Sequence, residues 1–400
     1  MTHSHRPQLR LLTLTLATAV AAAIGSAGLP ASASTLDGPG WGSGAPGTSV
    51  DLGDAATVIA RVAPGLLAET RAPATPAEEQ AAGSTGFQLA VPANPAEAIR
   101  MSPADAEGAG RPVGITIGGA AGQPRQTQGV TAFTSGASGA SASYVQPIAN
   151  GVRLMTALAG PEAGSDFSYA FDLPAGSYTT ELPGGDTIVS DAAHHYVGSL
   201  EQAWATDADG RALETSYRWS GSTLTQHVEL PAGTAYPVLM DPTWFYSYDF
   251  DVTIPGYHAA YPTTSAGAVD HMLHACFNCY FPITGAPKDY PIDGQILSLN
   301  ASPFTLLTLT AAPVRVQTAN GGAMQFVAQP GHFDGEGSMI TFSWYNDPSG
   351  YLHLYVHAKV LHDYGSALNI LNFRVAGISW LRYWQTVADT RPTGSGGGGV

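Results

Sequence analysis

Two neighbouring segments near the C-terminus constrain the fold more than any other feature of the chain. Residues 338–345 and 351–359 alternate apolar side chains with polar or aromatic ones, which is the period-two pattern of paired β-strands. Residues 368–387 instead repeat large apolar side chains every three or four positions, as one face of a helix does. Each element needs a partner for its apolar surface, so we expect the hairpin and the helix to pack together.

The connection Asn346–Gly350 sets the expected register of this hairpin. We expect Tyr345 opposite Tyr351 and Ser343 opposite His353, with the histidine face exposed to solvent. Burying each large apolar side chain of the other face stabilises the fold by roughly 1.5–3 kcal/mol before entropy is counted. That face comprises Ile340, Phe342, Trp344, Leu352, Leu354 and Val356.

Residues 247–390 form a predicted α+β domain with an antiparallel sheet packed on the terminal helix. Alternation from Phe250 to Ile254 predicts a first strand, and the apolar rhythm of residues 265–280 predicts a helix. Six strand candidates then precede the terminal helix: 294–300, 304–310, 313–318, 323–328, 338–345 and 351–359.

This order of elements resembles the helix-grip domains of the START and Bet v 1 type. In that family a curved antiparallel sheet wraps the terminal helix, and the space between them holds apolar ligands. The resemblance implies a binding cavity, although any one of its residues can equally belong to the core. The candidate ligand-binding residues are Phe342, Trp344, Leu354, Val356, Phe373, Trp380 and Trp384.

Residues 85–246 show a different pattern of short alternating runs separated by Gly-, Pro- and Asp-rich turns. Such a pattern predicts a β-rich domain, either an antiparallel sandwich or an open barrel. Four stretches resemble a module of exported actinobacterial proteins of unknown function, which has no established catalytic residues. They are Gly151–Leu154, Phe167–Pro174, Trp204–Gly210 and Tyr236-Pro-Val-Leu-Met-Asp-Pro-Thr-Trp244.

The N-terminus has the three regions of a secretory signal peptide. A short basic region precedes the apolar stretch Leu11–Ala27, and Ala31-Ser-Ala33 supplies the small residues of a cleavage site. We therefore expect residues 1–33 to be removed, giving a secreted, extracellular protein with no membrane span in the mature chain. Residues 34–84 have the Ala/Gly/Pro-rich composition of a flexible linker, and residues 391–400 that of a flexible tail.

The charge of the chain limits its partners. There are 31 acidic and 16 basic side chains, a formal net charge of −15. Phosphate backbones and anionic membrane surfaces repel such a chain, so we expect no nucleic-acid partner. No HExxH, nucleophile-elbow or phosphate-cradling motif occurs, and we expect neither a cofactor nor a metal.

The two cysteines, Cys276 and Cys279, allow three interpretations: a local disulfide, a reduced core pair, or half of a metal site with His271 and His274. On a helix over 265–280 these side chains do not converge on one point, as a zinc site requires. The pair also falls late in that helix, away from the N-terminal end that activates a thiolate. A structural pair, with the disulfide as candidate, is favoured.

A set of acidic and imidazole side chains supports a catalytic alternative. His332, Asp334 and Glu336 crowd one Gly-rich turn, and His353 and His357 lie on the last strand, so the five offer general acid and base groups. The competing interpretation is a solvated turn beside exposed histidines. We expect a non-enzymatic protein that binds a small apolar or lipid-like ligand; the alternatives are a secreted effector or hydrolase using this cluster, or a structural or adhesion module.

Overall fold

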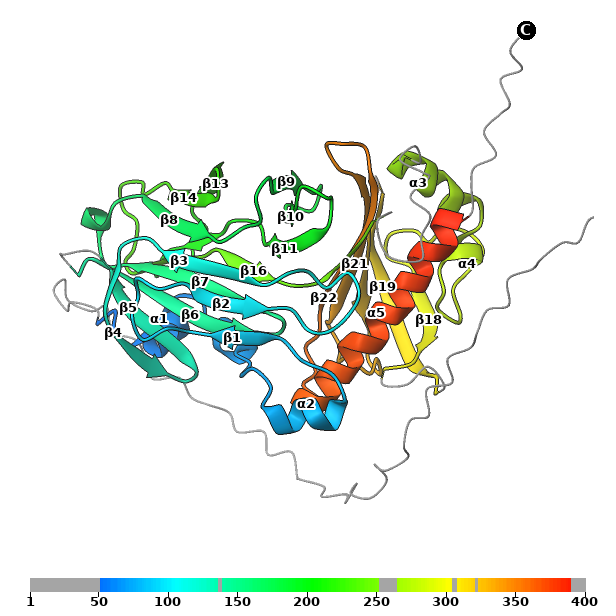
Figure 1. The fold of residues 1–400 in the computed structure, drawn as a ribbon, viewed down its shortest axis with the longest axis horizontal. Coiled ribbons are helices and arrows are strands. Elements are labelled where there is room, and N and C mark those ends of the chain that lie inside the picture. The colour runs from blue at the N-terminus through cyan, green and yellow to red at the C-terminus, as the bar shows by residue number, and fades with distance from the viewer. Residues whose placement is uncertain (1–50, 136–138, 252–264, 304–307, 321–322, 390–400) are drawn as a thin grey trace, which may run out of the picture. The chain divides into compact units, whose positions relative to one another are not determined.

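The computed structural model describes residues 51–135, 139–251, 265–303, 308–320 and 323–389 (Figure 1). Within them three antiparallel sheets and a long C-terminal helix confirm the α+β class. The expected signal peptide and the Gly-rich tail lie outside the described residues. None of the described helices has both the length and the apolar character needed to cross a bilayer.

The helices are α1 Ala55–Val62, η1 Leu66–Glu69, α2 Pro76–Ala82, η2 Pro161–Ala163, α3 Ala266–Ala275, α4 Phe277–Tyr280 and α5 Ser366–Asp389. The strands are β1 Gln88–Ala90, β2 Ile99–Ser102, β3 Val113–Ile117, β4 Ala120–Thr127, β5 Val130–Ser135, β6 Ser141–Ile148, β7 Gly151–Leu158, β8 Asp166–Phe171, β9 Tyr178–Glu181, β10 Thr187–Ser190, β11 Tyr196–Leu200, β12 Ala205–Thr206, β13 Thr215–Ser220, β14 Thr223–Val228, β15 Val238–Met240, β16 Thr243–Phe245, β17 Tyr248–Phe250, β18 Ile296–Ala301, β19 Thr310–Asn320, β20 Ala323–Ala328, β21 Met339–Asn346 and β22 Leu352–Lys359.

Residues 51–247, here called the β-rich part, contain strands β1 to β16, which form two sheets with a shared core. The first has the order β1-β2-β3-β8-β14-β13; the second runs β4-β5-β6-β7-β16-β11-β10-β9, with β12 and β15 beside it. Tyr169 and Leu224 of the first sheet pack with Leu154 and Trp244 of the second. The expected sandwich arises because alternate side chains of both sheets point into this layer.

The segment expected to be a flexible linker differs from that expectation between residues 51 and 84. Helix α1 buries Val58 and Ile59 against the ten-stranded sheet, and the Tyr144 hydroxyl donates a 2.8 Å hydrogen bond to the Leu52 carbonyl. The average composition of residues 34–84 does not reveal the short apolar stripe of α1. The Asp54 side chain caps the N-terminus of this helix. Helix α2 begins with a capping box between Thr75 and Glu78 and contacts α5.

Strands β17 to β22 form the third sheet, in the order β17-β22-β21-β20-β19-β18, and α5 packs on one of its faces (Figure 1). This sheet with α3, α4 and α5 is here called the C-terminal part. Phe342 lies against Trp380 with ring centroids 4.7 Å apart, and Trp344 against Trp384 at 5.7 Å. The apolar hairpin face therefore meets the terminal helix, as the alternation predicts.

Two elements of the C-terminal part differ from expectation. The helix expected over 265–280 is interrupted at Cys276, whose extended backbone separates α3 from α4. Strand β19 runs unbroken from residue 310 to 320, so the separate strand expected at 304–310 has no counterpart at its described end. The other residues of that expectation, 304–307, and Val252 and Ile254 of the first strand lie outside the described residues.

The hairpin register is two residues away from the expected one. Tyr345 lies opposite His353, not Tyr351, and Ser343 lies opposite Tyr355. The turn is centred one residue later because the Asp347 side chain accepts hydrogen bonds from the backbone N–H groups of Ser349 and Tyr351. An even shift leaves every side chain on its expected face.

Candidate functional site

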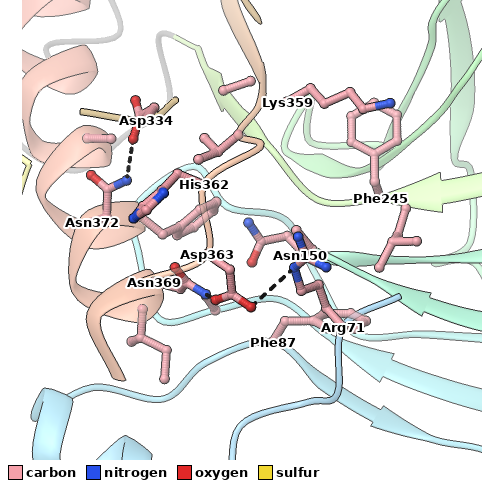
Figure 2. Close-up of a pocket in the computed structure, with 18 of the residues that line it drawn as sticks. Arg71, Phe87, Asn150, Phe245, Asp334, Lys359, His362, Asp363, Asn369 and Asn372 are labelled. Carbon is pink, nitrogen blue, oxygen red and sulfur yellow. Dashed lines mark hydrogen bonds and ion pairs between the residues drawn. The ribbon is translucent and has the colours of Figure 1, made fainter. Parts of the chain in front are cut away.

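A cavity of about 740 Å³ lies beside the N-terminal half of α5. Its walls come from α5, from residues 357–363 at and after the end of β22, and from the β-rich part, including residues 68–74 and 148–150. Figure 2 shows side chains of both parts facing this space, among them Phe245 and Asn150 opposite Asn369 and His362. The cavity is therefore built by two sequence-distant regions.

One end of the cavity is apolar and lies between α5 and the sheet. Phe373, Ala376 and Trp380 of α5 share it with Ile340 of β21. These helix positions are three or four residues apart, so they lie on one face of α5. Phe333 and Ile283, from the neighbouring loops, complete the apolar lining.

The other end carries charged side chains that are already paired. The Arg71 guanidinium lies 3.6 Å from Asp363, which also accepts a 2.8 Å hydrogen bond from Asn369 (Figure 2). The Lys359 ammonium lies 2.6 Å from the Glu69 carboxylate. Burial opposes ionisation of Glu69, but the hydrogen bond from Lys359 and the charge of Arg153 together lower its pKa.

Asp334 brings a titratable carboxyl group to the cavity wall. Burial raises its pKa to about 6, although hydrogen bonds from Asn372 at 3.2 Å and Tyr364 at 3.4 Å favour the charged form. His332 lies 4.0 Å from it, and burial lowers the His332 pKa to about 4. The His332 Nδ1 accepts the Asp334 backbone N–H, as a neutral imidazole can.

The structure does not bring the five candidate catalytic residues together. His332 and Asp334 lie in one turn next to α5, and Glu336 of the same turn is exposed. His357 lines the cavity and pairs with Asp186 of the β-rich part at 3.1 Å. His353, expected on an exposed face, is fully buried on the side of the sheet opposite α5. This correction arises because the β-rich part covers that face.

Of the seven candidate ligand-binding residues, Phe373 and Trp380 line the cavity. The other five are 0–6% exposed and belong to the core that fills the space between the sheet and α5 further along the helix. Those five are Phe342, Trp344, Leu354, Val356 and Trp384. The hollow thus lies beside residues 366–380 of α5, where small or polar side chains such as Ala376 and Asn369 leave space next to Phe373.

Sequence reasoning missed the side chains that the β-rich part contributes to the cavity. Arg71, Phe87, Asn150 and Phe245 come from segments far from α5 in sequence (Figure 2). No local pattern marks them, since their role depends on how the two parts pack. A charged residue in an otherwise Ala- and Pro-rich stretch, as at Arg71, is the one available signal.

Cys276 and Cys279 form a disulfide across the break between α3 and α4. His274 stacks on Tyr290 instead of turning toward the sulfur atoms. The described residues contain one group of potential metal ligands, Asp249, Asp251 and His353, none of which lines the cavity.

No family model matches the sequence, and no curated protein is similar to it. Among solved structures, the crystal structure of the di-domain ARO/CYC StfQ from the steffimycin biosynthetic pathway aligns with 10% identity. The alignment covers 70% of this chain and 87% of that chain, with a TM-score of 0.24. A likeness of this degree carries no argument about function, which rests on the cavity itself.

Proposed function

We propose that this chain is a secreted, non-enzymatic protein that binds a small apolar or lipid-like molecule in the cavity beside α5. The observation that carries the proposal is a hollow of about 740 Å³ with an apolar end and a polar end. Binding sites for small molecules are typically about 300–1,000 Å³ and mostly apolar, with a few polar groups that orient the ligand.

The two ends of the cavity suit an elongated molecule with one polar group. Hydrocarbon fits against Ile340, Phe373 and Trp380, where it loses contact with water. At the other end, Arg71 and Lys359 are already paired with carboxylates, so an anionic group of a ligand would have to break one of these ion pairs. An uncharged polar group, such as an alcohol, an ester or a ketone, can instead form hydrogen bonds beside them.

A fluorescence titration of the full chain with Nile red, an uncharged apolar dye, tests this function. Wild type is expected to bind one equivalent saturably, and a long-chain monoacylglycerol should displace the dye. Ala376→Phe fills the apolar end and should weaken binding at least tenfold, about 1.4 kcal/mol. Ile378→Phe, at an exposed position of the same helix, is the matched control and should bind as wild type does.

Two outcomes would contradict the binding proposal. One is uptake of dye that rises linearly without saturation, and the other is equal affinity in Ala376→Phe and Ile378→Phe. Circular dichroism of both variants establishes that they fold.

Export is tested separately. Expression in a host with a general secretion pathway should place the protein in the medium with Ser34 as its first residue, as measured by intact mass. A chain that stays in the cells with residues 1–33 attached would contradict this part of the proposal.

An esterase-like activity is a second candidate, favoured by one observation: Asp334 lines the cavity and has a pKa raised to about 6. A carboxyl group that titrates near neutral pH can act as a general base. Hydrolysis of p-nitrophenyl esters by the full chain, reduced at least about 100-fold in Asp334→Asn, would support it. Hydrolysis that Asp334→Asn leaves unchanged would exclude that role.

A further inference from the structure

A second cluster of chemistry-bearing side chains lies on the face of the third sheet that is opposite α5. Asp249 lies on β17 and Asp251 just after it; being two residues apart, they point to the same side. The observed register pairs Asp249 with Tyr355 and Phe250 with Leu354. Extending this register by one residue brings Asp251 opposite His353 on β22. All three are 0–2% exposed, and one potential ligand atom from each lies within 4.8 Å of the others.

Three buried carboxyl groups surround the imidazole of His353. Its Nδ1 lies 2.6 Å from Asp249, its Nε2 lies 3.7 Å from the buried Asp347, and Asp251 is close to the same ring. Among the described residues the ion pairs of Asp249 and Asp347 are made with imidazoles, those of His353 and His194. Buried carboxylates are stable in a protein when they are paired or when they coordinate a metal ion, and the ligand atoms of this cluster lie close enough together to coordinate one.

The donor atoms are those that a transition metal takes up. Imidazole nitrogen together with carboxylate oxygen suits zinc, which binds at about 2.0–2.2 Å from each. The Tyr345 hydroxyl donates a 2.7 Å hydrogen bond to the other oxygen of Asp249, which fixes the orientation of that carboxylate. His353 Nε2 is completely buried and has no hydrogen-bond partner among the described residues.

We propose that Asp249, Asp251 and His353 form a buried binding site for a divalent transition metal ion, with Zn²⁺ as its principal occupant. The ion takes the place of the proton that His353 and Asp249 share in its absence. The site lies where the third sheet meets His194 and Tyr178 of the β-rich part, both of which contact Asp347. It shares no residue with the cavity, so it stands independently of the proposed ligand.

Calorimetric titration with Zn²⁺ of the full chain, purified without a histidine tag and stripped with EDTA, tests the site. Wild type should bind one equivalent, and Asp251→Asn should lower the affinity at least tenfold. Asp186→Asn is the matched control, since Asp186 also pairs with a β22 histidine, His357, but this pair has no third ligand group close to it among the described residues. It should bind Zn²⁺ as wild type does.

A Co²⁺ spectrum of wild type provides a second readout that does not require a variant to fold. One equivalent should give the visible absorption of a protein-bound, low-symmetry ion, and Zn²⁺ should abolish it. The proposal is overturned by a spectrum of aqueous Co²⁺, by absence of stoichiometric Zn²⁺ binding to wild type, or by equal Zn²⁺ affinity in Asp251→Asn.

Discussion

The two faces of the β21–β22 hairpin are both buried, but by different physical means. On one face Phe342 and Trp344 pack against aromatic rings of α5. On the other, Tyr355 and His357 pack against Tyr196 and Asp186 of the β-rich part. His353 on the same face pairs with Asp249 of the neighbouring strand β17. The first face is stabilised by buried apolar area, and this contribution does not depend on the orientation of the side chains. The second face is stabilised by ion pairs and hydrogen bonds, which require particular atoms in particular protonation states.

This difference separates the two candidate sites as well. The cavity arises where the apolar packing along α5 gives way to small and polar side chains. The carboxylate–imidazole cluster arises where a polar face is covered by a second layer. Substitutions on the two faces should therefore differ in how they respond to pH and to metal.

The largest effect is expected for the apolar face. Phe342→Ala removes a fully buried ring that contacts Phe281, Phe326 and Trp380, and should lower the free energy of unfolding by about 3–5 kcal/mol. Urea denaturation followed by circular dichroism at pH 7 and pH 9 measures it. The loss should be equal at both pH values; a loss below about 1 kcal/mol would show that this face is not the stabilising one.

The next effect is a pH dependence of the polar face in EDTA. Interactions with Asp249 and Asp347 outweigh burial and raise the pKa of His353 from 6.5 to about 10. A raised folded-state pKa gives stability that is complete below pH 6.5 and is lost as pH rises toward 10. The free energy of unfolding should therefore fall by up to about 1.4 kcal/mol per pH unit between pH 7 and 9.5.

Asp249→Asn should remove most of that slope. Phe342→Ala should instead lower the free energy of unfolding by the same amount at each pH, so that its pH curve runs parallel to that of wild type. The shifted groups Asp334 and His332 titrate below this window, and the buried tyrosines above it. A slope that Asp249→Asn does not change would assign the pH dependence to another part of the chain.

A smaller effect is expected at the partly exposed end of the polar face. His357 and Asp186 are 24% and 21% exposed, so water screens their 3.1 Å ion pair. Asp186→Asn should lower the free energy of unfolding by roughly 1 kcal/mol or less, an upper figure for screened pairs. A loss as large as that of Phe342→Ala would mean that the two faces are not stabilised differently after all.

The smallest effect is expected for the ion pair at the polar end of the cavity. Arg71 and Asp363 are 28% and 48% exposed, and Asp363→Asn should change the free energy of unfolding by about 0–1 kcal/mol. The same variant should release Nile red faster in stopped-flow measurements, because Asp363 also holds Asn369. An unchanged dissociation rate of Nile red would show that the pair of Arg71 and Asp363 does not help to retain a ligand in the cavity.

The sequence was sufficient for the features that depend on periodicity. The apolar face, the terminal helix and five of the six strands expected between the two helices follow from alternation and from the stripe through Trp380 and Trp384. It was insufficient where a second layer decides the outcome. Alternation distinguishes the two faces of a strand, but it does not show whether the polar face is exposed to solvent or covered by another layer. Here the layer that carries His194 and Tyr178 covers that face, and His353 is buried.

The candidate sites show the same limit. Phe373 and Trp380 could be proposed from the helix pattern, whereas Arg71 reaches the cavity only through packing of a segment that composition assigned to a linker. Asp249 and Asp251 resemble ordinary polar positions of a strand until β22 places His353 beside them. The register, set by the Asp347 side chain, depends on hydrogen bonds that no hydropathy pattern encodes.

Photolabelling with an uncharged long-chain alcohol that carries a diazirine tests whether the ligand binds in the cavity beside α5. Mass spectrometry of the labelled full chain should place the adducts in residues 369–380 and 357–363, and Ala376→Phe should abolish them while Ile378→Phe does not. Adducts concentrated instead on the exposed apolar side chains Ile292, Ile296 and Leu309 would show that the chain binds such molecules on its surface and not in the cavity beside α5.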